Sequence, residues 1–148
     1  MDKEKKDKII GYTTGVFDLF HIGHVKLLNN AKSLCDELIV GVTSDELVSY
    51  KNKKAIINQN ERLEIVKNIK SVDQVIFQED MDKFKMWEKL KFDIMFVGDD
   101  WKGTKKWNEL DKIFSEVGVE IVYFAYTKGT SSTLINNTLK KLRNNNEK

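Results

Sequence analysis

The sequence contains short, almost continuously apolar runs that alternate with segments of helical periodicity. The runs LIVGV, within 37–43, and IMFV, within 93–97, lack the polar alternation of a half-exposed strand. Continuous apolar character is typical of parallel strands that are covered on both faces. Strands that alternate with helices predict right-handed βαβ crossovers. We therefore expect a single Rossmann-like α/β/α sandwich with a mainly parallel sheet.

The same patterns predict where the elements lie. The expected strands are 9–14, 37–43, 74–77, 93–97 and 120–125. A first helix is expected from the periodic residues Val25, Leu28, Ala31, Leu34 and Cys35, and a second one starts at Ser44. A third helix is expected over 61–69 with Asn60 as its N-cap, and a fourth around 84–90. The last two are expected through Trp107, Leu110, Phe114 and Val117, and over 131–142. Ligands of such sheets bind beyond the carboxyl ends of the strands, where the strand order reverses.

Length and composition limit the classes of protein that fit. A chain of 148 residues predicts one domain, which we place at 9–143, between a disordered charged N-terminus at 1–8 and a disordered tail at 144–148. The net charge of +2 gives no reason to expect nucleic-acid binding. No apolar run approaches the length of a membrane span, and the first residues do not form a secretory signal. The single cysteine cannot form a disulfide within the chain. We therefore expect a cytoplasmic protein.

Both histidines of the protein lie between the first strand and the first helix, in the segment 15–24, GVFDLFHIGH. Gly15 lets backbone N–H groups approach a phosphate, and a helix N-terminus adds donors and the positive end of its dipole. His21 and His24, separated by the small Gly23, can point at one anion. The alternatives are a turn with two incidental histidines, or a metal site, which would need carboxylates as further ligands.

Four motifs in order carry a resemblance to a known family. These are GVFDLFHIGH at 15–24, Glu61-Arg62 at a helix start, GDDW at 98–101 and the segment 126–133. Together they resemble the HxGH nucleotidyltransferase superfamily and, within it, the cytidylyltransferase family; GDDW resembles the motif of bacterial glycerol-3-phosphate cytidylyltransferases. The resemblance covers nearly all of 9–142. It implies transfer of CMP from CTP to glycerol 3-phosphate, with CDP-glycerol and pyrophosphate as products.

The resemblance also implies which residues form the site. The implied catalytic residues are His21, His24 and Lys53. The implied acceptor-binding residues are Lys51, Arg62 and Lys83. The implied nucleotide-binding residues are Gly15, Val16, Phe17, His21, His24, Lys53, Asp100, Tyr126, Thr127, Lys128, Gly129, Thr130, Ser131, Ser132 and Thr133. Mg²⁺ is expected to bind mainly through the nucleotide phosphates, with no metal ligands assigned in the protein. A homodimer, and a product used for a cell-surface polymer, are also implied.

Taken alone, several of these residues have simpler interpretations. The lysines at 51, 53 and 54 could form a solvated surface, Arg62 could be an exposed helix arginine, and 129–133 could be an ordinary helix cap. The chain also departs from the family pattern, because Tyr126 and Lys128 stand where the family has arginine and glutamate. Rival functions are a cytidylyltransferase for phosphocholine or phosphoethanolamine, an adenylyltransferase of the same fold, and a silent nucleotide-binding module.

Overall fold

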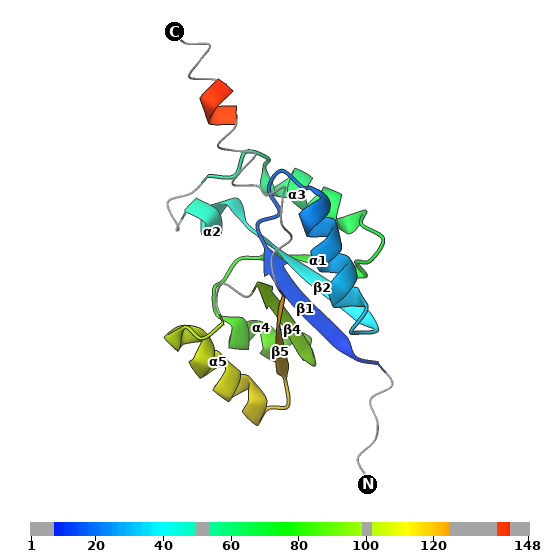
Figure 1. The fold of residues 1–148 in the computed structure, drawn as a ribbon, viewed down its shortest axis with the longest axis vertical. Helices are drawn as coiled ribbons and strands as arrows, with labels where there is room; N and C mark the ends of the chain where they lie inside the picture. The colour runs from blue at the N-terminus through cyan, green and yellow to red at the C-terminus, as the bar shows by residue number, and fades with distance from the viewer. Residues whose placement is uncertain (1–7, 50–53, 99–101, 125–138, 143–148) are drawn as a thin grey trace.

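A five-stranded sheet with the strand order β3-β2-β1-β4-β5 forms the centre of the molecule, and every pair of neighbouring strands is parallel. The computed structural model describes residues 8–49, 54–98, 102–124 and 139–142 (Figure 1). The strands are β1 (Ile10–Gly15), β2 (Glu37–Thr43), β3 (Gln74–Gln78), β4 (Ile94–Gly98) and β5 (Glu120–Phe124). The predicted α/β sandwich with a parallel sheet is confirmed.

Helices cover both faces of this sheet (Figure 1). They are α1 (Ile22–Lys32), α2 (Asp45–Ser49), α3 (Gln59–Lys67), α4 (Lys83–Leu90) and α5 (Lys105–Glu116). Leu28 of α1 and Val66 of α3 belong to one buried cluster with residues of β2 and β4. Trp107 and Phe114 of α5 belong to a second cluster, on the other face. The continuous apolar character of β2 follows, because its successive side chains enter opposite clusters and both are buried.

Some helix boundaries differ from the predicted ones. The N-cap of α3 is Asn58, whose side chain accepts from the Glu61 N–H, so the prediction of Asn60 is wrong by two residues. Leu34 and Val117, which the periodicity placed on apolar faces, lie past the ends of their helices and are 48% and 38% exposed. Of the predicted helix at 131–142, residues 131–138 lie outside the described residues, and 139–142 are helical.

The pairing of β1 differs on its two sides. β1 pairs with β2 at six positions, from Ile10 to Gly15, but with β4 at only three, from Gly11 to Thr13. The Thr13 hydroxyl donates to the Phe96 carbonyl of β4 at 3.0 Å. We call this short pairing of 11–13 with 94–96 the β1–β4 seam. The strand order reverses there, so its carboxyl end is where a ligand of such a sheet is expected to bind.

Within the described part of the chain, no helix has the length and apolar character needed to cross a bilayer.

Candidate active site

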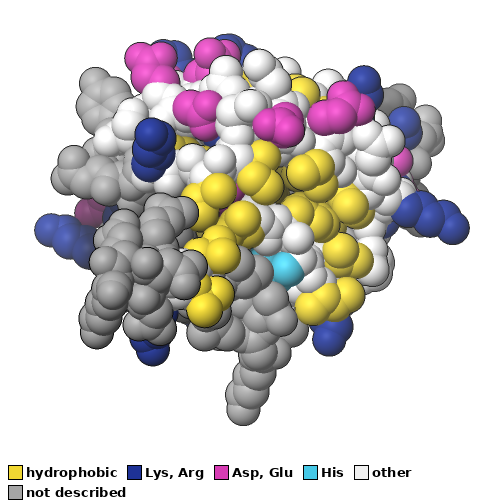
Figure 2. Space-filling view, turned by 90° about the horizontal axis from the view of Figure 1, so that it is seen from above, with side chains coloured by type: hydrophobic (Ala, Val, Ile, Leu, Met, Phe, Trp, Pro, Cys, Tyr) yellow, Lys and Arg dark blue, Asp and Glu magenta, His cyan; other side chains and the backbone are white. Residues whose placement is uncertain are grey.

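The connection from β1 to α1, residues 16–21, leaves the carboxyl end of the β1–β4 seam. Figure 2 shows the molecule from above relative to the view of Figure 1, and on this face a histidine side chain is exposed among hydrophobic side chains. Ile22 of α1 and Ile56 are half exposed, at 54% and 50%. The two histidines of the chain are both in this region, since His21 is the N-cap of α1 and His24 lies in its first turn.

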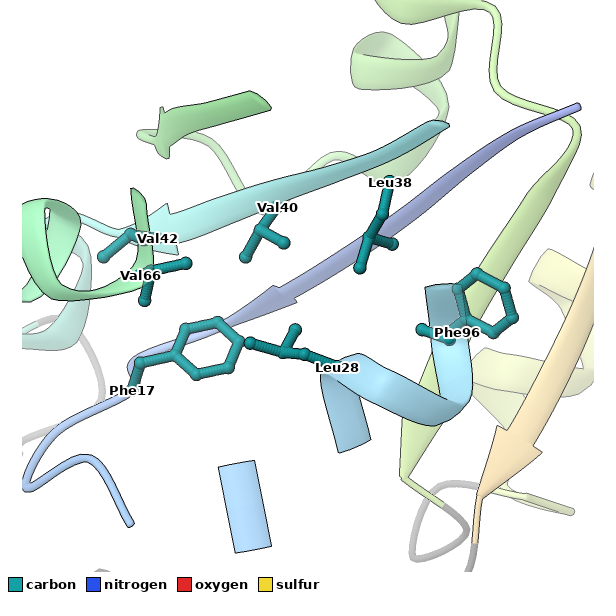
Figure 3. Packing of buried hydrophobic residues seen from close by; sticks show 8 residues of the cluster. Phe17, Leu28, Leu38, Val40, Val42, Val66 and Phe96 are labelled. Atoms are coloured by element: carbon teal, nitrogen blue, oxygen red, sulfur yellow. The ribbon is translucent and has the colours of Figure 1, made fainter. Parts of the chain in front are cut away.

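Two residues of the connection have a left-handed backbone. Phe17 has φ 54° and Leu19 has φ 50°, and Asp18 lies between them. Such a conformation in a non-glycine residue costs about 1–3 kcal/mol and persists only where the surroundings fix it. The ring of Phe17 is one such constraint: it is 4% exposed and reaches toward Leu28 of α1 and Val66 of α3 (Figure 3).

Gly15 makes room for that ring. A Cβ atom at Gly15 would lie 2.9 Å from Phe17 Cε2, which is too close for an ordinary contact. The glycine therefore has a packing reason in addition to the phosphate approach predicted for it. Replacing it would displace Phe17 and disturb the turn that leads to the histidines.

His21 and His24 cap α1 with their imidazoles. Nδ1 of His21 accepts from the Gly23 N–H at 3.0 Å, and Nδ1 of His24 accepts from the His21 N–H at 3.1 Å. This reciprocal arrangement is a capping box in which imidazole nitrogens take the place of the usual oxygen acceptors. The rings stack with centroids 4.0 Å apart. The spacing of three residues therefore places the two side chains at the N-cap and N3 positions of one helix.

The capping bonds determine where the imidazole protons lie. Because each Nδ1 accepts a hydrogen bond, the proton of each neutral ring is assigned to Nε2. Burial, together with a smaller effect of the neighbouring His21, lowers the pKa of His24 to about 4, while Asp18 opposes the shift. Burial also lowers the pKa of His21. At pH 7 the pair therefore offers two neutral N–H donors, and the positive charge needed at a phosphate site must come from other residues.

Aromatic side chains surround His24. Its ring centroid lies 5.4 Å from that of Phe17, edge to face, and 5.0 Å from that of Phe20. These contacts, together with the capping bond, fix the imidazole of His24 in one orientation. They also supply the burial that keeps the ring neutral.

Arg62 lies inside the protein. Its side chain is fully buried, so the simpler expectation of an exposed helix arginine is wrong. Nε donates to the Ile57 carbonyl at 2.8 Å, and Nη1 donates to the carbonyls of Val16 and Thr43 at 2.7 and 2.8 Å. Nη2 forms an ion pair with Asp45. The predicted contact with an acceptor is not what this placement shows: the guanidinium contacts four residues in three segments of the protein around the site.

Asp18 is a residue of the site region that the sequence analysis did not single out. Its carboxylate accepts from the backbone N–H groups of Ile56 and Ile57. The local pattern could not identify this role, because the two N–H donors lie 38 and 39 residues away in the sequence.

The other predicted site residues fall into two groups. Lys83 is the first residue of α4, which follows the carboxyl end of β3, and it lies at the same edge of the sheet as the histidines. The remaining ones lie outside the described residues: Lys51, Lys53, Asp100, Tyr126, Thr127, Lys128, Gly129, Thr130, Ser131, Ser132 and Thr133. The structure thus brings together Gly15, Val16, Phe17, His21, His24 and Arg62.

Comparison with known proteins agrees with this architecture. A model of the cytidylyltransferase-like family matches residues 12–138. Glycerol-3-phosphate cytidylyltransferase of Bacillus spizizenii is 38% identical over 136 residues, which cover 91% of this chain and 98% of that protein. FAD synthase of Korarchaeum cryptofilum is 35% identical over 131 residues, which cover 85% of this chain and 88% of that protein.

Among solved structures, a lipopolysaccharide core biosynthesis protein from Thermoplasma volcanium matches with a TM-score of 0.69 and 32% sequence identity. The match covers 83% of this chain and 99% of that chain. The resemblance drawn from the four sequence motifs is confirmed by the family model and by these relatives. The chain belongs to the cytidylyltransferase-like family.

Proposed function

We propose that this protein transfers CMP from CTP to glycerol 3-phosphate and releases CDP-glycerol and pyrophosphate. The similarity to a glycerol-3-phosphate cytidylyltransferase over 98% of that protein supports this choice of substrates. One structural observation carries the chemistry: two neutral imidazoles, each with its Nδ1 engaged in capping, lie at the carboxyl end of the strand where the sheet reverses its order. Such a pair is suited to binding phosphate oxygens.

The reaction needs no general base from the protein. The acceptor phosphate has a second pKa of about 6, so it is mostly a dianion at pH 7. One of its oxygens attacks the α-phosphorus of CTP, a new P–O bond forms, and the bond from the α-phosphorus to the bridging oxygen breaks, so that pyrophosphate leaves with both electrons. The protein must align the two phosphates and stabilise the charge that develops. The Nε2–H groups of His21 and His24 do this by hydrogen bonding.

Positive charge is assigned to lysines. Lys53 would contact the nucleotide phosphates, while Lys51 and Lys83 would bind the acceptor phosphate. The segment 126–133, with Lys128 and its hydroxyl residues, would hold the nucleotide, and Asp100 would complete that site. Neutral histidines make these cations necessary, because N–H donors alone do not balance the charge of a triphosphate.

Mg²⁺ fits this scheme as an ion that arrives with CTP. The described residues contain no group of three His, Cys, Asp or Glu side chains that could hold a metal ion. Phosphate oxygens are preferred ligands of Mg²⁺, which usually keeps several waters and few protein contacts. Bound in this way, the ion would neutralise charge on the leaving pyrophosphate. The residues of the chain then act on the α-phosphate and the acceptor.

The protein's setting is also part of the proposal. It is a cytoplasmic homodimer with no nucleic-acid or membrane partner, and its product is an activated polyol phosphate for a cell-surface polymer. The homodimer can be tested by light scattering, and a monomer at working concentration would contradict it.

An adenylyltransferase is the second candidate, because an FAD synthase is 35% identical to this chain over most of both proteins. The deciding experiment follows pyrophosphate release with CTP or ATP, each paired with glycerol 3-phosphate, phosphocholine, phosphoethanolamine or flavin mononucleotide. Release only with CTP and glycerol 3-phosphate is expected. Turnover with ATP and flavin mononucleotide would establish the second candidate, and no turnover with any pair would indicate a silent nucleotide-binding module.

A further inference from the structure

Asp18 joins two segments that are distant in the sequence. Its Oδ2 accepts from the Ile56 N–H at 2.9 Å, and its Oδ1 accepts from the Ile57 N–H at 3.0 Å. Hydrogen bonds to a charged acceptor are stronger than those between neutral groups. Two adjacent backbone donors on the two oxygens of one carboxylate fix both the position and the rotation of that side chain.

Arg62 holds the same segment from its other side. While Asp18 binds the N–H of Ile57, Nε of Arg62 donates to the carbonyl of Ile57 at 2.8 Å. Nη1 of the same arginine donates to the carbonyl of Val16 at 2.7 Å, across 46 residues. Val16 is two residues before Asp18. The contacts therefore close a ring from Asp18 through Ile57 and Arg62 to Val16 and back to Asp18.

This ring includes one of the two strained residues of the connection, Phe17, and the other, Leu19, follows directly after it. Phe17 and Leu19, the neighbours of Asp18, both have positive φ values. Two such residues need external contacts to hold them, because each alone favours another conformation. His21, which follows two residues after Leu19, starts α1 and donates its N–H to His24. A shift of the connection would therefore move both imidazoles together.

We propose that Asp18 is a positioning residue, which sets the direction of the two Nε2–H groups through the backbone of Ile56 and Ile57 and does not contact substrate. The catalytic consequence of this role rests on the proposed function. Two other roles would leave the carboxylate in the same place: direct electrostatic action on His24, or a ligand for Mg²⁺.

Variants on both sides of the contact separate these roles. Asp18→Asn leaves one oxygen to accept and turns an NH₂ group toward the other N–H. Ile56→Pro removes one donor and leaves the carboxylate untouched, and the Ile56 side chain is half exposed. The matched control is Asp36→Asn, because Asp36 also accepts a backbone N–H, from Ile9 at 2.8 Å, but lies before β2 at the amino end of the sheet.

We expect kcat for pyrophosphate release to fall at least tenfold in both Asp18→Asn and Ile56→Pro, with KM for CTP and for glycerol 3-phosphate within about threefold of wild type. A loss confined to the transition state has this signature. Asp36→Asn should keep the wild-type kcat. Amide hydrogen exchange, measured by NMR without substrate, should be at least tenfold faster at Ile57 in both variants, and unchanged there in Asp36→Asn.

Three results would overturn the proposal. The first is wild-type kcat in Ile56→Pro beside a loss in Asp18→Asn, which would mean that the carboxylate acts on His24 or on an ion. The second is recovery of Asp18→Asn at raised Mg²⁺, which would make Asp18 a metal ligand. The third is a loss of kcat without faster exchange at Ile57. If Asp18→Asn does not fold, Ile56→Pro decides alone. If wild type itself has no activity, the proposed function fails, and the exchange data still test the contact.

Discussion

The backbone N–H of His21 donates to Nδ1 of His24, so the first histidine of the pair fixes the ring of the second. The ring of His21 is fixed in turn by the N–H of Gly23. Each imidazole thus has two separate tasks, since one nitrogen stabilises the start of α1 and the other faces outward from the cap. Substitutions that imitate one nitrogen at a time can separate these tasks.

His24→Asn and His24→Gln form such a pair. The asparagine oxygen can replace Nδ1 as acceptor but nothing replaces Nε2, whereas the glutamine amide reaches the Nε2 position. We expect His24→Asn to keep its thermal stability and lose about 10² or more in kcat, as for other transition-state donors, which contribute about 2.7–4 kcal/mol. His24→Gln should retain more activity, and because glutamine is a usual N3 residue of a capping box, its thermal stability should also stay close to that of wild type. Equal kcat values in the two folded variants would contradict a role for Nε2.

The stability of the protein should depend on pH through His24. Its pKa in the folded protein is about 4, below its ordinary value of 6.5. Between these values the unfolded chain binds a proton that the folded chain does not, so unfolding becomes easier. The contribution of His24 is complete above about pH 6.5 and is lost as the pH falls toward 4. The Tm of wild type should therefore fall more steeply than that of His24→Asn between pH 7 and 4, and parallel curves would exclude this coupling.

Arg62→Lys should destabilise the fold strongly. An ammonium group cannot reproduce the planar set of donors that reaches Val16, Thr43, Ile57 and Asp45. Buried acceptors left without a donor cost about 1–3 kcal/mol each. We expect a loss of about 3 kcal/mol or more in the free energy of unfolding, measured by urea titration. Lys67→Met, at an exposed position of the same helix, is the control and should change it by less than about 0.5 kcal/mol. A loss below about 1 kcal/mol would contradict the structural role of Arg62.

The lysines before α3 should differ from one another in kinetics. Lys51→Ala should mainly raise KM for glycerol 3-phosphate, and Lys53→Ala should weaken CTP as well, because loss of a binding contact affects the ligand concerned first. Lys54→Ala is the control, since Lys54 is exposed and has no assigned role. Steady-state kinetics with each substrate varied will separate the three. The same change in both KM values for Lys51→Ala and Lys53→Ala would remove the assignment.

Sequence patterns predicted the elements well where the signal is local. The apolar run of β2 gave its bounds, and the turn-plus-histidine segment pointed to the correct edge of the sheet. The choice between Asn58 and Asn60 as N-cap was beyond local rules, since either asparagine can cap a helix. The burial of Arg62 depends on carbonyls 46 and 19 residues away, which periodicity does not report. The neutral state of the histidines depends on their burial, to which Phe17 and Phe20 contribute at His24 and which the sequence pattern does not report.

The short ladder between β1 and β4 has a consequence for how the molecule comes apart. With three paired positions against six on its other side, β1 is held to β2 more firmly than to β4. The sheet thus has two parts, one made of β1, β2 and β3 and the other of β4 and β5, and the two parts are joined by its shortest strand pairing. Partial unfolding that separates β1 from β4 would break the hydrogen bond from the Thr13 hydroxyl to the Phe96 carbonyl before the strands within either part come apart. A ligand bound at the carboxyl end of β1 and β4 would contact both parts of the sheet and oppose their separation. The unfolding of the protein should therefore become more cooperative as its substrates bind.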